Sequence, residues 1–334
     1  MKIIIKNLFA AVTLSLVFFS TSLTAQVDAG EVISNTCGQK KSKCEGEIKW
    51  KDGMVYTGSI SKGLPQGDGM MKWQDGSEYK GKFEKGLRHG FGTFTHSNGI
   101  RFEGEWEKDQ IGTQGSMFYP NGDEYVGEFQ KGKRHGVGIF MTLSGENYNG
   151  EWKNGVEDGE GSYTYTDGSY YIGNSVGGVK EGEGMVVWTE GDTLKANWIN
   201  GSLDGVATYF FNNGDQLVNK WRNGKLSVKS TYTFSDGETI KGSLNNLRSR
   251  LAVIGNEMAE VESNFQTCYM GIAMEMKNNQ EYNLSKEFMV AALDLADPID
   301  GDNQGMIAQE IQLVDQAMKE RGYAKLPEPK KKKQ

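Results

Sequence analysis

The chain has 334 residues with 45 glycines, 11% aromatic side chains, only 3 histidines and a formal net charge of -7. This acidic balance argues against a nucleic-acid partner, because neutralising phosphates requires a basic face. The histidines have no nucleophile, base or orienting acid beside them in the sequence, so we expect a non-enzymatic protein that uses no cofactor and no metal.

The first 25 residues have the pattern of a secretory signal peptide. Lys2 and Lys6 precede an apolar run from Leu8 to Phe19, and small residues follow up to Ala25. The apolar run is shorter than the roughly 20 residues that a membrane-spanning helix needs. We expect cleavage after Ala25, with an uncleaved anchor as the alternative. The mature chain would then be periplasmic or extracellular, or peripheral to a membrane.

Three cysteines lie in two parts of the chain. Cys37, in a lead-in segment at residues 26–43, and Cys44 are close enough in sequence for a disulfide, which in an oxidising compartment would pin the first edge of the array that follows. Such a short loop contributes about 2 kcal/mol of stability. A zinc site is the alternative, although no histidine lies at ligand spacing. We expect Cys268 to be a buried, inert thiol, with an intermolecular bridge as its alternative.

A repeat with a period of 23 residues runs from about residue 44 to 244. In most periods Asp or Asn precedes a glycine, and these dipeptides are typical of type I′ turns, in which both central residues take positive φ. The period is therefore a period of hairpins, in an array where each unit contacts mainly its neighbours. The turn glycines are Gly53, Gly76, Gly99, Gly122, Gly145, Gly168, Gly191, Gly214 and Gly237.

Each period also carries two aromatic or apolar positions separated by a glycine. Strand side chains alternate between faces, so these three positions share one face of a strand. The glycine leaves bare backbone over which an aromatic ring from the neighbouring strand can lie. The pattern reads Tyr56-x-Gly58-x-Ile60, Tyr79-x-Gly81-x-Phe83, Phe102-x-Gly104-x-Trp106, Tyr125-x-Gly127-x-Phe129 and Tyr148-x-Gly150-x-Trp152.

These residues resemble the MORN repeat, whose pattern Tyr-x-Gly-x-Phe/Trp-x-x-Gly-x-x-x-Gly-x-Gly is followed almost residue for residue at 125–138. The resemblance covers about 200 residues, in about eight to nine repeats. It implies a mainly β fold, an elongated single-layer antiparallel sheet of hairpins with one aromatic-lined groove. The later repeats depart from the pattern and are expected to form a degenerate cap. Their departures are Ser175, Leu194, Ala196, Leu217, Asn219 and Ile240.

The groove is the expected binding site, because no second layer is long enough to cover it and part of each ring should stay exposed. Rows of Tyr and Trp on a contiguous apolar surface usually mark a contact site, here for a protein of the cell envelope. Phospholipid or polysaccharide binding is the alternative, and so is an aromatic face that serves only as a core. The binding residues are Tyr79, Phe83, Phe102, Trp106, Tyr125, Phe129, Tyr148 and Trp152.

From residue 245 to 322 the apolar spacing changes to steps of 3 and 4, which predicts helices. We expect a small helical unit that packs on itself or covers the last sheet edge, with a parallel dimeric coiled coil as the alternative. Asp300 to Gly305 resembles the start of a calcium loop, but Ile311 stands where a bidentate Glu is required. A turn that caps the following helix is the expected structure.

The last segment, residues 323–334, is expected to be a disordered tail rich in lysine. A run of lysines contacts anionic lipid with about 1 kcal/mol per residue near a membrane. We expect the tail to be solvated, with contact to an anionic membrane as the alternative. The lysines are Lys330, Lys331, Lys332 and Lys333.

Overall fold

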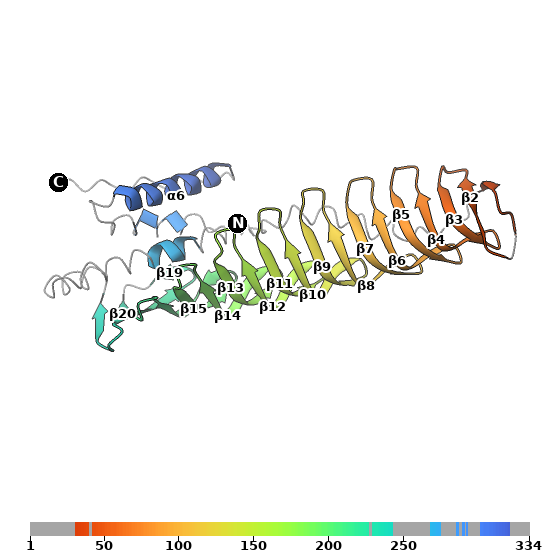
Figure 1. Ribbon diagram of the computed structural model, residues 1–334. Coiled ribbons are helices and arrows are strands. Elements are labelled where there is room, and N and C mark those ends of the chain that lie inside the picture. The colour runs from red at the N-terminus through yellow and green to blue at the C-terminus, as the bar shows by residue number, and fades with distance from the viewer. Residues whose placement is uncertain are drawn as a thin grey trace, which may run out of the picture. The chain divides into compact units, whose positions relative to one another are not determined.

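The computed structural model describes residues 31–39, 42–226, 229–242, 268–274, 285–286, 289–290, 292 and 301–320 (Figure 1). The signal peptide, the lysine tail and most of the expected first helix lie outside these residues. The chain forms two compact units, one of residues 1–167 with 174–179 and one of residues 168–173 with 180–334. Among the described helices, none is long and apolar enough to cross a membrane.

The described strands belong to one open antiparallel sheet of 21 strands, so the mainly β, single-sheet prediction is confirmed. In the first unit the strands are β1 (Val32–Asn35), β2 (Cys44–Trp50), β3 (Val55–Ser61), β4 (Leu64–Lys72), β5 (Glu78–Glu84), β6 (Leu87–Thr95), β7 (Arg101–Glu107), β8 (Gln110–Phe118), β9 (Glu124–Gln130), β10 (Lys133–Met141), β11 (Asn147–Lys153) and β12 (Val156–Thr164). Strand β13 (Tyr170–Val176) has residues in both units.

The remaining strands lie in the second unit, except that the first of them begins at Val179 of the first unit, and most of the later ones are short. They are β14 (Val179–Val187), β15 (Thr193–Ile199), β16 (Ser202–Leu203), β17 (Gly205–Phe210), β18 (Gln216–Arg222), β19 (Lys225–Leu226), β20 (Ser230–Thr233) and β21 (Thr239–Gly242). Helix α6 (Gly301–Glu320) and a helical segment at residues 268–274 follow. Because residues 301–305 already belong to α6, they do not form a calcium loop.

The Asp-Gly turns differ from the predicted type I′ geometry. Gly76 has a positive φ of 90°, whereas Asp75 does not have a positive φ. Gly76 N donates to Trp73 O at 3.1 Å and Ser77 N donates to Asp75 Oδ1 at 2.9 Å. This is a three-residue loop in which a turn is followed by one left-handed glycine. The Asp side chain stabilises this loop by accepting a hydrogen bond from the backbone N–H of the residue two positions later.

Type I′ turns lie instead at the opposite end of the hairpins. Lys85 and Gly86 both have positive φ, 54° and 88°, and they join the paired residues Glu84 and Leu87. The same arrangement occurs at Lys62-Gly63, Lys131-Gly132, Asn154-Gly155, Asn200-Gly201 and Asn223-Gly224. The sequence prediction therefore placed the two-residue turns at the wrong end of each hairpin.

The cysteines agree with their predicted roles. A disulfide joins Cys37 to Cys44, and Cys37 is buried against the aromatic core. Cys268 is a free, fully buried thiol whose pKa is raised by burial. It lies in the helical segment 268–274, where Gly271 faces the ring of Trp188 so closely that a Cβ there would lie 3.0 Å from it. Within the second unit, this segment therefore packs against Trp188.

Candidate functional site

The eight aromatic residues predicted as a binding groove form the core of the first unit. All of them are between 0% and 3% exposed: Tyr79, Phe83, Phe102, Trp106, Tyr125, Phe129, Tyr148 and Trp152. The expectation that part of each ring stays open is therefore wrong. The alternative, an aromatic face that packs as a core, matches the burial.

A bend in the hairpins of the first unit explains this burial. The pairing of β5 with β6 shifts register between Gly81 and Phe83, and other hairpins shift at equivalent glycines. An irregularity of this kind bends the strand. Tyr79 and Phe83 stand four residues apart on β5, yet their ring centroids are only 5.1 Å apart. The bend folds the sheet onto its own aromatic face, so that no second layer is required.

The rings form a continuous ladder of edge-to-face contacts, the geometry that aromatic pairs prefer. Neighbouring centroids are 5.0 to 5.5 Å apart with interplanar angles of 77° to 90°. The order along the ladder is Tyr56, Phe83, Tyr79, Trp106, Phe102, Phe129, Tyr125, Trp152 and Tyr148. The ladder links every hairpin to the next.

The strand glycines make room for the tyrosine rings, as expected. A Cβ on Gly81 would lie 2.6 Å from the Tyr79 hydroxyl, and a Cβ on Gly92 would also collide with that ring. The ring comes from the same strand as Gly81, not only from a neighbouring strand. The hydroxyl of Tyr79 donates to Lys82 O at 3.1 Å. Burial raises the pKa of Tyr79 far above its ordinary value, so this hydroxyl stays protonated.

Sequence reasoning missed two buried arginines at one repeat position, 46 residues apart. The first, Arg88, is 4% exposed, and its guanidinium carbon lies 4.3 Å from the ring centre of Trp106. Its Nε and its backbone N both donate to Asp109 Oδ1 at 2.9 Å. Asp109 stands where the neighbouring hairpins have glycine, with a φ of 68°. That substitution was the signal in the sequence for a buried ion pair.

The second arginine, Arg134, is also 4% exposed and lies 4.1 Å from the ring centre of Trp152. Its Nη2 donates to Gly155 O at 2.7 Å, but its Nε and Nη1 have no hydrogen-bond partner. Buried Glu157 is an electrostatic neighbour. Burial raises the pKa of Glu157 to about 7, and Arg134 opposes that rise. Neither arginine is open to a ligand, so both belong to the core.

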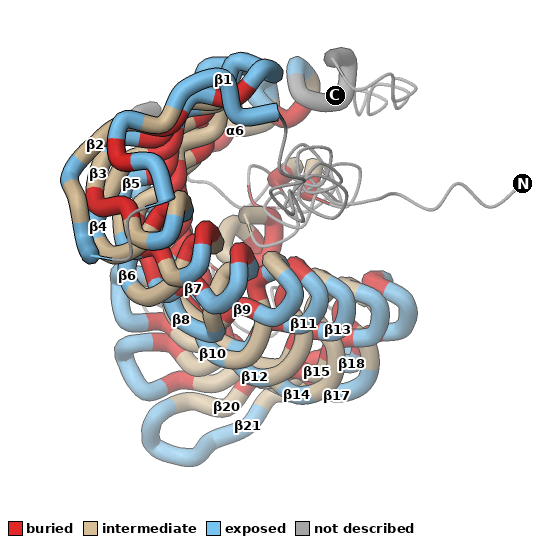
Figure 2. The backbone as a smooth tube through the Cα atoms, turned by 90° about the vertical axis from the view of Figure 1, so that its right-hand side faces the viewer, coloured by how far each residue is buried: buried red, intermediate tan, exposed pale blue. Residues whose placement is uncertain are grey.

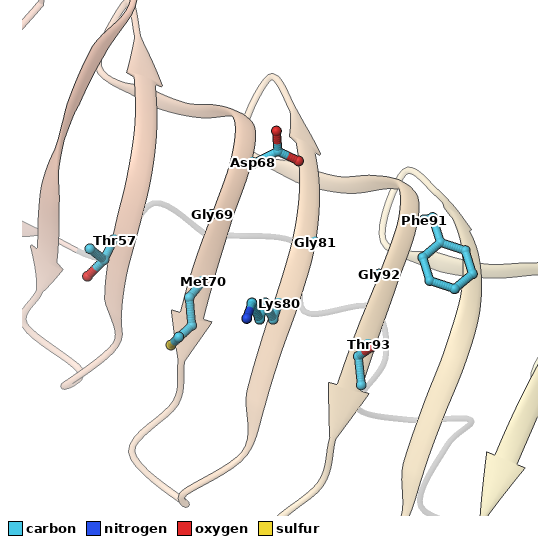
Figure 3. Close-up of a pocket in the computed structure, with 9 residues that line it drawn as sticks. All are labelled: Thr57, Asp68, Gly69, Met70, Lys80, Gly81, Phe91, Gly92 and Thr93. Atoms are coloured by element: carbon cyan, nitrogen blue, oxygen red, sulfur yellow. The ribbon is translucent and has the colours of Figure 1, made fainter.

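The opposite face of the sheet is exposed. Buried and exposed stretches alternate along the successive hairpins (Figure 2). On β3 to β6 this face holds a shallow groove of about 640 Å³. Thr57, Met70, Lys80 and Thr93 lie on one side of a line of glycines and Asp68 and Phe91 on the other (Figure 3). Phe91 is 63% exposed.

A second feature of this face is an apolar patch on the β9–β10 hairpin. It consists of four side chains that are 38% to 56% exposed: Val126, Val137, Ile139 and Met141. Ile139 pairs directly with Val126, and Val137 and Met141 are its same-face neighbours on β10. We call this set the apolar patch. It is contiguous, which distinguishes it from the scattered exposed apolar residues that are normal on a protein surface.

Carboxylates flank the apolar patch. Val137 pairs with Glu151, Met141 pairs with Glu124, and Gln114 pairs with Glu128. We call Glu105, Glu128, Glu151 and Glu160 the carboxylate row. None of the ion pairs found in the described part of the chain involves these four residues. No cluster of three or more metal-ligating side chains occurs among the described residues either.

Comparison with known families supports the hairpin architecture. The model of the MORN repeat matches residues 56–78, 79–101, 102–124, 125–142, 148–170, 171–193, 195–216 and 220–239, which together exceed half of the chain. The chain belongs to the MORN-repeat family. MORN repeats are a non-catalytic module that typically serves as a scaffold for binding protein or lipid.

No curated protein matches the chain. Among solved structures, the E1021V mutant of the TCP10 domain of Danio rerio CPAP is similar, at 11% identity and a TM-score of 0.36. The match covers 64% of this MORN-repeat chain and 92% of that domain.

Proposed function

We propose that this protein is a non-enzymatic scaffold of the cell envelope that holds a protein partner on the solvent-facing side of its MORN sheet. The apolar patch is the observation that carries the proposal, because four apolar side chains lie together and exposed on a face that no other described element covers. Patches of this kind mark contact sites. The aromatic face cannot serve as the binding surface, because its rings are already packed against one another.

The cell-envelope location is supported by the sequence of residues 1–25, which resembles a signal peptide. A disulfide between Cys37 and Cys44 agrees with an oxidising compartment. N-terminal sequencing of the chain recovered from the periplasm or medium of expressing cells tests this part. We expect a mature terminus at Gln26, and a chain that stays in the cytoplasm with Met1 intact would contradict it.

Site-specific photo-crosslinking tests the binding face. A photoreactive amino acid at Val126 should crosslink the envelope partner. The matched control is Lys80, which occupies the same repeat position 46 residues earlier and is also exposed. We expect an adduct from position 126 and little from position 80. Equal yields from both positions, or none, would reject the apolar patch as the contact.

Anionic lipid is the second candidate, because Lys330, Lys331, Lys332 and Lys333 form a cationic run. If these lysines mediate binding, co-sedimentation with vesicles should need anionic lipid, fall as ionic strength rises and vanish when the four lysines are deleted. We expect no co-sedimentation with neutral or anionic vesicles. Strong, lysine-dependent binding would favour the lipid function over the protein scaffold.

A further inference from the structure

We propose that the apolar patch and the carboxylate row together bind a cationic amphipathic α-helix of the partner, lying across strands β7 to β12. This inference rests on the proposed function and names the chemistry of the partner. It follows from the width of the patch, the spacing of the carboxylates and the lack of competing cations.

The width of the patch favours a helix over an extended peptide. Val137, Ile139 and Met141 are successive same-face residues of β10, so they span about 13 Å along the strand. A helix with its side chains is about 10–12 Å across, whereas an added strand would cover only about 4.8 Å. A helix crossing the strands would therefore cover the patch with its apolar stripe.

The spacing of the carboxylates matches a helical repeat. Glu105, Glu128 and Glu151 recur every 23 residues, that is, on every second strand, at β7, β9 and β11. Two strand spacings amount to about 9.6 Å. Residues i and i+7 of a helix lie about 10.5 Å apart on the same face. Lysines or arginines at every seventh position of the partner would each reach one carboxylate.

The electrostatic complement is missing from the described part of the chain. Glu105, Glu151 and Glu160 are exposed, whereas Glu128 is half-buried and its Oε1 accepts from Val137 N at 3.2 Å. No described cation pairs with any of the four. On β5, the positions equivalent to Val126 and Glu128 are Lys80 and Lys82. The apolar and acidic character therefore belongs to the middle hairpins and is not a general property of the repeat. Complementary charges at such an interface raise the association rate and fix the register.

A designed peptide tests this chemistry. The probe is a helix of about 20 residues with leucines on one face and lysines at every seventh position, beside a scrambled peptide of equal composition. Fluorescence anisotropy with the full mature chain measures affinity at two salt concentrations. We expect binding that weakens several-fold at high salt, and weaker binding of the scrambled peptide. Equal affinity for the two peptides would overturn the proposal.

Charge reversal gives the decisive comparison. Glu128→Lys with Glu151→Lys should lower affinity for the lysine peptide by about tenfold or more, and the double variant should prefer a peptide with glutamates at those positions. The control, Glu47→Lys with Glu84→Lys, changes net charge equally on β2 and β5, outside the strands of the proposed site, and should leave affinity unchanged. Equal losses in both double variants would overturn the proposal. Unchanged melting temperatures would show that the variants fold.

Two outcomes separate this inference from the proposed function. If position 126 crosslinks an envelope protein but the charge-swapped pair shows no preference, the scaffold proposal stands and the cationic helix is wrong. If deletion of residues 330–333 raises affinity for the lysine peptide tenfold, the chain's own lysines occupy the row and the proposal of a partner helix is overturned. We expect that deletion to leave the affinity for the lysine peptide unchanged.

Discussion

The two buried arginines of the first unit occupy one repeat position, but their positive charges are neutralised in different ways. Arg88 and Arg134 are equally buried, and each stacks on a tryptophan of the next strand. Arg88 has the carboxylate of Asp109. At the position equivalent to Asp109, Arg134 has Gly155, which offers only a carbonyl, and its acidic neighbour Glu157 has a pKa that burial raises to about 7. A single loop residue thus decides whether the buried cation has a counter-ion.

Removing that counter-ion should have the largest effect. Asp109→Gly restores the residue found in the neighbouring hairpins but removes the carboxylate that pairs with the buried Arg88, so the free energy of unfolding should fall by about 3–5 kcal/mol. Urea denaturation measures the loss. Replacing both residues, with Arg88→Met and Asp109→Gly, should recover most of it. A single variant as stable as the parent would show that the aromatic rings alone compensate the charge.

Glu157 should make the Arg134 region sensitive to pH. Its pKa is raised to about 7 from 4.5, so the folded state binds the proton more tightly than the unfolded state. The contribution of Glu157 to stability is therefore fully present below about pH 4.5 and is lost as pH rises through about 7, a change of roughly 3 kcal/mol. Glu157→Gln should remove this slope from the pH profile of unfolding. An identical profile for the variant would contradict the raised pKa.

Tyr125 links the Arg134 region to the glycine slots, and its ring lies 5.7 Å from the guanidinium carbon of Arg134. Gly127→Val would place a Cβ 2.7 Å from the Tyr125 hydroxyl, so the ring would be displaced, at a cost of about 1–3 kcal/mol. Thermal unfolding measures this cost. Lys133→Val, exposed on β10, is the control. Lys131 is unsuitable as a control, because its φ of 51° would strain a valine.

The smallest effect on stability should come from giving Arg134 a carboxylate partner of its own. Gly155→Asp supplies Arg134 with the carboxylate that Arg88 already has, and the new ion pair should exceed the cost of placing Asp at positive φ. We expect a net gain of about 1 kcal/mol in the free energy of unfolding. A loss of stability would indicate that the φ of 94° at this position excludes Asp, although Asp109 tolerates 68°.

The sequence predicted the hairpin period, the face that each aromatic residue takes and the Cys37–Cys44 disulfide, because these depend on local spacing. It misplaced the type I′ turns, since Asp-Gly fits two turn geometries and the Asp75 side chain favours the longer one by capping Ser77 N. It also predicted open rings. Their burial depends on a register shift between strands, which single-strand periodicity does not report.

The Arg88–Asp109 pair could have been predicted from an Asp at a glycine position. The apolar patch could have been noticed as well, since Val126, Val137 and Ile139 occupy positions that face away from the tyrosines. Whether a described cation lies beside the carboxylate row depends on how neighbouring strands pair. That information appears only with the folded sheet.

The pairing of each strand in the first unit with its sequence neighbours has a mechanical consequence. Tension applied between residues 44 and 164 would load one strand pair at a time, so the hairpins should peel off in succession at low force rather than shear together. Each hairpin would release 23 residues, or about 80 Å of extended chain, per step. The chain can therefore lengthen under load in steps of one hairpin each. When the load is removed, the hairpins can refold one at a time.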